Sequence, residues 1–116
     1  MIAMAANNMN EGVISVFFIR NGKMIGREHF HMTGVQSESY GDIMAAFLKQ
    51  YYASTPFLPK EIILEHEVNE QELIEQYLSE RRGNLVHILT PQKGDKAKLL
   101  KLARDNAFLV LTQDTE

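Results

Sequence analysis

The chain has 116 residues, of which 45% are hydrophobic and 23% are charged, and its formal net charge is −3. This length and composition predict one globular domain and exclude two separate cores. The chain contains no cysteine, which excludes disulfide bonds and thiolate metal sites. No apolar run approaches the roughly 20 residues that span a membrane. We therefore expect a cytoplasmic domain without a membrane partner.

Three strands are predicted in the first third of the chain. Residues 1–8 are short and mostly apolar, and Val13–Arg20 places β-branched and aromatic side chains on both alternating faces. A strand with two apolar faces is typical of one that is covered on both sides. Asn21–Gly22 is a strong hairpin signal, because both residues tolerate a positive φ. Lys23–Met32 is then the partner strand.

The stretch "GREHFH" in this partner strand contains two histidines that raise the question of a metal site. His29 and His31 are two residues apart, so in a strand both imidazoles point from one face. A zinc site needs a third ligand, and Glu28 points to the opposite face. The pattern therefore favours a half-exposed strand, and we predict no metal site.

Helices and strands alternate in the rest of the chain. The apolar stripe from Ile43 to Tyr51 predicts a helix. The later elements are a strand at Glu61–His66, a helix capped by Asn69 and ended by Gly83, a strand at 84–91, and a helix from about Asp95 to Ala107.

The last helix is expected to bury one apolar stripe, formed by Leu99, Leu102, Ala103 and Ala107. Asn106 lies among these apolar residues, and we expect it to make a structural hydrogen bond or to contact a neighbouring domain. The element order is β-β-β-α-β-α-β-α, which predicts an α/β fold with a mixed sheet and helices on both faces. This is the order of a ribonuclease H-like fold.

Charge is segregated along the second half of the chain. Residues 61–80 contain seven acidic residues and no base, whereas residues 81–104 contain seven basic residues and one acid, Asp95. Such asymmetry is typical of a protein with a basic face for a polyanion. The alternative is a pair of solvated helices of opposite charge.

Two basic groups are the candidate nucleic-acid-binding residues. In "PQKGDK", Gly94 precedes a helix whose free N–H groups suit a phosphate oxygen, and Lys93 and Lys96 flank it. The second group is on the hairpin and consists of Arg20, Lys23 and Arg27. The alternatives are solvated lysines that only flank a turn, and pairing of Arg27 with Glu28 or with a neighbouring domain.

Three segments, Val16–Phe30, Phe57–Leu64 and Pro91–Ala107, closely resemble the UvrC family of excinucleases, which acts in bacterial nucleotide excision repair. The resemblance covers residues 2–112. It implies that residues 1–116 form a single domain of a longer protein, located between the UvrB-interacting motif and the C-terminal endonuclease domain. The implied partners are damaged DNA, a UvrB-like subunit that binds flanking segments, and the adjacent endonuclease domain.

The resemblance further implies a degenerate copy of the nuclease fold, and this can be compared with the residues. A ribonuclease H-type site holds two metal ions with at least three carboxylates, one of them from the first strand. The first strand, Ile2–Ala6, contains no acid. We therefore predict no catalytic residue and no cofactor, and a scaffold that positions the endonuclease domain. The alternatives are a protein-interaction module and a weak metal-dependent nuclease that uses Asp42, Glu65 and Glu67.

Overall fold

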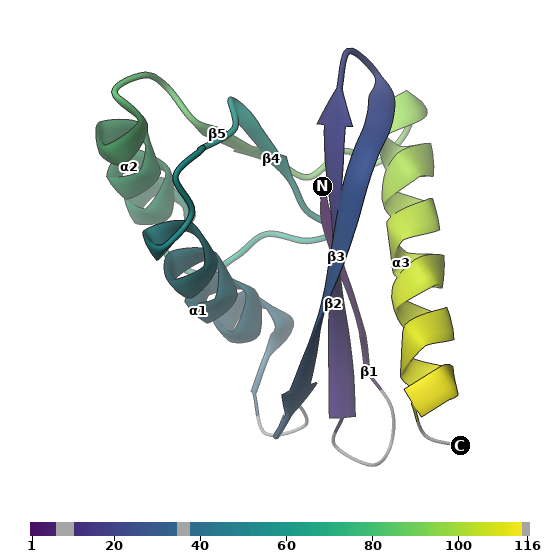
Figure 1. Cartoon of the computed structure of the whole chain (residues 1–116). Coiled ribbons are helices and arrows are strands. Elements are labelled where there is room, and N and C mark those ends of the chain that lie inside the picture. Colours follow the sequence, from purple (N-terminus) through teal and green to yellow (C-terminus); the bar gives the residue numbers. More distant parts are fainter. Residues whose placement is uncertain (7–10, 35–37, 115–116) are drawn as a thin grey trace.

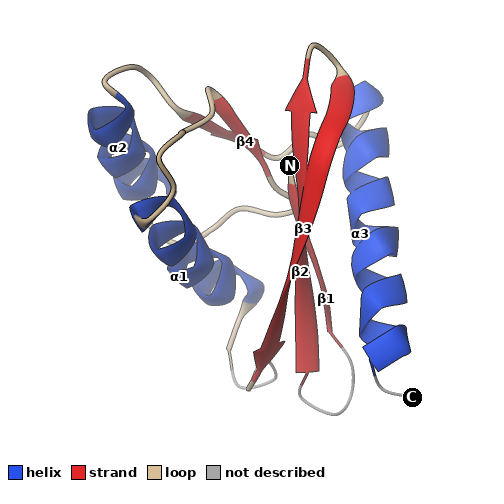
Figure 2. Cartoon of the chain, in the orientation of Figure 1, coloured by secondary structure: helices blue, strands red, loops and turns tan. Residues whose placement is uncertain are grey.

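A computed structural model describes residues 1–6, 11–34 and 38–114. In chain order, its elements are β1 (Ile2–Ala6), β2 (Glu11–Arg20), β3 (Lys23–Thr33), α1 (Tyr40–Ala53), β4 (Glu61–Ile63), α2 (Gln71–Arg82), β5 (His87–Leu89) and α3 (Asp95–Asp114). Helices α1 and α2 lie on one side of the strands and α3 lies on the other (Figure 1). Figure 2 shows the same three layers with the helices in blue and the strands in red. None of the described helices combines the length and hydropathy that crossing a lipid bilayer requires.

Strand β2 is at the centre of the core. Its residues 12–17 are all buried, which agrees with the expectation of a strand covered on both faces. Ile14 and Val16 pack in a cluster with most of the buried residues of α1 and those of α2, whereas Val13 and Phe17 pack against α3. Because successive side chains of a strand point to opposite faces, one strand joins both halves of the core.

The strands form two sheets. Strands β1, β2 and β3 pair antiparallel in that order, and β4 pairs with β5 in parallel. Among the described residues, one parallel bridge, between Ile2 and Leu64, connects the two sheets. The expected mixed sheet is therefore not continuous between β1 and β4. Beyond this bridge, a side chain replaces the backbone acceptor: the Glu65 carboxylate accepts a hydrogen bond from the Met4 N–H of β1 at 2.8 Å.

Several local expectations differ from the structure. Strand β4 ends at Ile63 rather than His66, and β5 is confined to His87–Leu89. The residue that caps α2 is Glu70, with a left-handed φ of 60° and no side-chain cap. The expected cap, Asn69, instead donates its side-chain N–H to Asp42 at the start of α1. This contact between helices outweighs the local capping preference.

Helix α3 buries Ala103 and Ala107 as expected, but its large buried side chains differ from the expected ones. Leu100, Ala103, Ala107 and Leu111 are buried, whereas Leu102 is 57% exposed. The helix is apolar around much of its circumference, so periodicity did not identify the stripe that faces the sheet. The expected end at Ala107 was also wrong, because the helix continues to Asp114.

Helix α2 supplies hydrogen bonds to the edge of β5 that faces away from β4. The Ile88 N–H donates to the Glu75 carboxylate at 2.9 Å, and the Ile88 carbonyl accepts from the Gln71 side chain at 3.4 Å. The Ser79 hydroxyl accepts from the Val86 N–H at 2.9 Å and donates to the Val86 carbonyl at 3.5 Å. These helical side chains are four residues apart, so they lie on one face of α2 and act in place of a further strand.

Candidate functional site

The β2–β3 hairpin positions the first basic group. Asn21 and Gly22 have φ values of 52° and 76°, so both central residues of the turn are left-handed, as a two-residue hairpin with the sequence Asn-Gly requires. Arg20 and Lys23 face each other across this turn, and both side chains are exposed. Arg27 is also exposed, further along β3.

The N-terminus of α3 positions the second group. Gly94 has a φ of 93°, and its carbonyl accepts the Lys98 N–H at 3.1 Å, which begins the helix. Lys93 and Lys96 are exposed beside it. The Lys96 ammonium lies 3.0 Å from the Glu61 carboxylate, a surface ion pair that sequence reasoning did not anticipate. Such an exposed pair is weak, so Lys96 can exchange this partner for another anion.

The fold brings the two basic groups to one end of the molecule. Phe17 and Ile19, just before Arg20, pack with Leu100 in the first turns of α3. Figure 1 shows the hairpin and the start of α3 at the same end. We call this surface the basic end. It is defined by the residues of the two groups, which are Arg20, Lys23, Arg27, Lys93, Gly94 and Lys96.

The acidic and basic stretches of the second half of the chain lie mostly on different helices. The acidic stretch includes most of α2, and the basic stretch continues into α3, which lies on the other side of the strands (Figure 1). Some acids within the first stretch are engaged locally: Glu61 pairs with Lys96, and Glu70 lies 3.2 Å from the Lys49 ammonium. Glu65 of the acidic stretch also lies 3.6 Å from Arg104, and Arg81 and Arg82 of the basic stretch are in the last turn of α2, so the segregation in space is only partial.

The position of a ribonuclease H-type metal site can be compared with the residues around β1. Met4 occupies the middle of this strand, and its N–H is bound by Glu65. The other oxygen of the Glu65 carboxylate lies 3.6 Å from Arg104 Nε, and the Glu65 side chain is 11% exposed. Within residues 1–6, 11–34 and 38–114, no group of three or more carboxylate or imidazole side chains is arranged to hold a metal ion.

Tyr40 lies near this carboxylate at the start of α1. Burial, followed by the negative charge of Glu65, raises the pKa of the Tyr40 phenol to about 12. Its hydroxyl approaches the backbone of Glu65 and His66 but makes no well-formed hydrogen bond to any described residue. The Tyr40 ring also contacts His66 edge-on, with centroids 5.0 Å apart. A protonated phenol, a carboxylate and a guanidinium form a structural polar cluster here.

The first histidine of "GREHFH", His29, contacts α3 on the other face of β3. His29 Nε2 lies 2.5 Å from Asn106 Oδ1 on α3. The same Oδ1 accepts from Ser15 Oγ at 3.4 Å, and Ser15 is fully buried. In the tautomer with the proton on Nε2, His29 donates to this oxygen. Asn106 thus makes the expected structural hydrogen bond. Ser15 was missed, although it was the single polar residue in an apolar run.

Glu28 points away from these histidines, as the strand alternation predicts. Its carboxylate accepts a hydrogen bond from the Tyr51 hydroxyl of α1 at 3.3 Å. The expected alternative pairing of Arg27 with Glu28 has no counterpart among the ion pairs of the described residues. The two faces of β3 therefore contact different helices.

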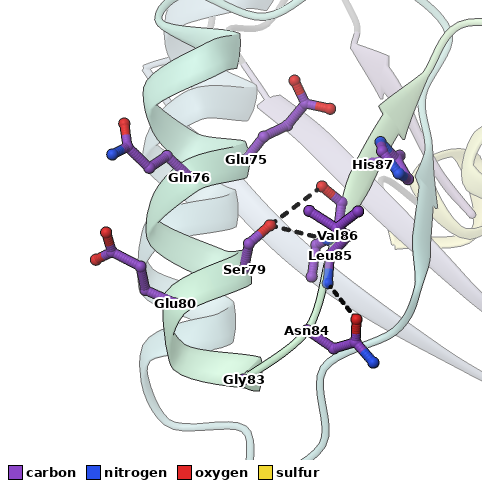
Figure 3. A pocket seen from close by; sticks show the side chains of 9 residues that line it. All are labelled: Glu75, Gln76, Ser79, Glu80, Gly83, Asn84, Leu85, Val86 and His87. Carbon is purple, nitrogen blue, oxygen red and sulfur yellow. Dashed lines mark hydrogen bonds between the residues drawn. The ribbon is translucent and has the colours of Figure 1, made fainter.

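An open groove of about 630 Å³ lies between α2 and the chain that leads into β5 (Figure 3). It contains Ser79, Glu75 and His87, residue types that could suggest a hydrolase. Figure 3 shows that the Ser79 hydroxyl is directed to the backbone of Val86. The Glu75 carboxylate accepts the hydrogen bond from the Ile88 N–H of β5. These side chains complete the fold, so we do not assign a reaction to the groove.

Comparison with known proteins identifies the family. Residues 1–114 match the family described as UvrC Ribonuclease H-like domain. Relatives named UvrABC system protein C include those of Lachnospira eligens, Alkaliphilus oremlandii and Alkaliphilus metalliredigens, which are 49%, 46% and 41% identical over 96%, 99% and 100% of this chain. The chain spans 18% of the length of each of these relatives. No solved structure gives a significant match. The chain belongs to the UvrC ribonuclease H-like domain family.

Proposed function

We propose that this chain is a non-catalytic, ribonuclease H-like domain of a UvrC-type excinuclease that acts in nucleotide excision repair in the bacterial cytoplasm. Residues 1–116 form a single domain of a longer protein. The domain positions the adjacent endonuclease domain and contacts damaged DNA, and a UvrB-like subunit binds segments outside it. Family membership, together with the small share of each relative that the chain spans, supports this proposal.

The observation that carries the DNA contact is the basic end. Its two basic groups are about seventy residues apart in the chain, yet both lie where the hairpin meets the start of α3. Exposed lysines and arginines gain affinity for DNA by displacing counterions from the phosphates. The helix N-terminus after Gly94 adds backbone N–H groups to the same surface.

The residues at the junction of β1 and β4 support a non-catalytic role. A methionine occupies the centre of the first strand, where a metal ligand would be needed. The nearest carboxylate, Glu65, already binds a backbone N–H and lies beside the Arg104 guanidinium. A cation from the chain itself thus faces this carboxylate, which makes the junction a structural connection between strands.

DNA binding by the basic end is tested by salt titration. Lys23→Ala and Lys93→Ala are each expected to weaken binding to a labelled duplex and to reduce the slope of log Kd against log salt by about 1, because each removes one phosphate contact. Fluorescence anisotropy measures both quantities. Lys96→Ala is expected to reduce the slope as well, because the weak surface pair with Glu61 lets Lys96 exchange that partner for a phosphate.

Lys49→Ala is the matched control. Lys49 has the same side-chain exposure as Lys96, 50%, and is also paired with a glutamate, but it lies on α1. It is expected to leave the affinity and the slope unchanged. An equal loss in Lys49→Ala would mean that net charge and not the basic end determines binding. Absence of binding at low salt would contradict the DNA contact.

The non-catalytic role predicts the result of a nuclease assay. Incubation of the domain with nicked, bubble-containing and intact duplex DNA in Mg²⁺ or Mn²⁺ is expected to give no cleavage on a denaturing gel. Cleavage that persists in Glu65→Gln would indicate a contaminating nuclease. Cleavage that disappears in Glu65→Gln would overturn the scaffold role and favour a weak metal-dependent nuclease using Asp42, Glu65 and Glu67.

A protein-interaction module is the second candidate function. The observation that favours it is the exposure of two leucines on one face of α3: Leu102 and Leu109 are seven residues apart and are 57% and 59% exposed. Exposed apolar groups on one helix flank are typical of protein contact surfaces. The salt titration separates the two candidates, because a pure protein-interaction module does not bind DNA.

A further inference from the structure

The β2–β3 hairpin contains a bulge that exposes two apolar side chains. Phe18 lies opposite Gly26, whereas the next residue, Ile19, lies opposite Met24, so Ile25 has no residue opposite it on β2. Met24 is 49% exposed and Ile25 is 65% exposed. Bulges commonly redirect a side chain at a sheet edge. Here the redirected residues point an apolar surface outward instead of adding to the core.

The surroundings of these two side chains are cationic. Residues 20–27 read "RNGKMIGR" and contain three bases and no acid. Lys23 directly precedes Met24, and Arg27 follows two residues after Ile25. The start of α3, which Lys93 precedes by two residues, lies at the same end of the molecule (Figure 1). A surface with two apolar side chains at its centre and cations around them is complementary to a ligand that has an apolar surface surrounded by anionic groups.

From this arrangement we propose that the hairpin binds DNA at unpaired or unstacked bases, with Met24 and Ile25 against the bases and Arg20, Lys23 and Arg27 on the flanking phosphates. The inference rests on the proposed DNA contact and adds the form of DNA to it. Isoleucine and methionine are among the apolar residues that insert between base steps in proteins that kink DNA. In DNA, the apolar faces of the bases are accessible to such side chains only where base stacking is interrupted.

The proposal predicts a preference between two DNA forms. To contact bases in an intact duplex, the hairpin must first unstack a base step, which costs free energy. In a duplex with a central unpaired stretch, this cost is already met by the DNA. The phosphate contacts are the same in both forms. We therefore expect the unpaired form to bind about tenfold more tightly, with a similar salt slope for both forms.

The test compares labelled intact duplex with a duplex of the same length that has a central bubble, by fluorescence anisotropy at one low salt concentration. The variant Met24→Ser/Ile25→Ser is expected to reduce the preference for the bubble from about tenfold to about twofold or less, with the affinity for intact duplex unchanged. Ile25→Phe is expected to keep or increase the preference, because an aromatic ring stacks on a base. Circular dichroism melts verify that each variant is folded.

Leu85→Ser is the matched control, because Leu85 is also 65% exposed but lies between α2 and β5. It is expected to leave the preference unchanged. Equal binding of the two DNA forms, or a preference that survives in Met24→Ser/Ile25→Ser, overturns this inference and leaves the DNA contact standing. Absence of binding to either form overturns both. Tighter binding to phosphatidylserine-containing vesicles than to the bubble duplex identifies a membrane surface instead and also overturns the inference.

Discussion

Glu65→Ala is expected to lower the free energy of unfolding by about 2–3 kcal/mol, because it removes the only side chain that joins β1 to the end of β4 among the described hydrogen bonds. The Met4 N–H loses its acceptor, and Arg104 loses its carboxylate partner. Since a single bridge, Ile2 to Leu64, otherwise connects the two sheets in the described part of the chain, few other contacts can compensate. Urea denaturation followed by circular dichroism measures the change.

Two further variants separate the hydrogen bond from the charge. Glu65→Gln keeps an oxygen that accepts the Met4 N–H, so it is expected to cost about 1 kcal/mol. Glu67→Ala removes an exposed acid two residues away and is expected to change stability by less than about 0.5 kcal/mol. If Glu65→Ala were as mild as Glu67→Ala, the carboxylate would not connect the sheets.

Asn106→Ala is expected to destabilise the domain by about 1–2 kcal/mol, because it leaves the buried Ser15 hydroxyl without its acceptor. His29 loses the same acceptor. These losses outweigh the small gain in helix propensity that alanine brings to α3. Thermal or urea unfolding measures the difference.

A more discriminating measurement is the sign of the change in the free energy of unfolding that Ser15→Ala causes in two backgrounds. In the wild-type protein, Ser15→Ala removes one partner of Asn106 and is expected to destabilise. In the Asn106→Ala variant, Ser15→Ala removes an unpaired buried hydroxyl and is expected to stabilise, since replacing both partners of a buried hydrogen bond is less costly than replacing one. Additive effects of the two substitutions would mean that Ser15 and Asn106 are not energetically coupled.

Local chemistry made the hairpin and the central strand predictable. The Asn21–Gly22 pair determines a two-residue turn through its backbone preferences alone. The apolar run of β2 predicted burial on both faces, because alternate side chains of this strand pack against helices on opposite sides. The family resemblance noted from three chain segments is confirmed by the match over residues 1–114.

Features that depend on tertiary position were not predictable from the sequence. The bulge at Ile25 changes which residues of β3 share a face, and alternation counted from the turn does not include it. In α3, two neighbouring apolar stripes compete, and only packing against β1 and β2 selects the one with Leu100 over the one with Leu102. The capping preference of Asn69 was overridden by Asp42, a residue from another helix.

The two basic groups were proposed from the sequence, but their arrangement in space was not predictable. Each basic group was identified from its own short segment, because a turn with lysines and a hairpin with arginines are local patterns. Their position at one end depends on Ile19 packing near Leu100, which no local pattern encodes. The role of Glu65 was likewise hidden, since the sequence does not show that its carboxylate reaches the backbone of β1.

The hydrogen bonds between α2 and the outer edge of β5 have a consequence for the behaviour of the chain at high concentration. An edge strand with free backbone groups is a template for aggregation with other chains. Because Gln71, Glu75 and Ser79 occupy those groups on β5, an incoming strand would have to displace them. The outer edge of β3 remains, and its bulge together with Lys23 and Arg27 opposes the flat pairing that fibrils require. The outer edges of β5 and β3 are thus both unfavourable for strand pairing with another chain.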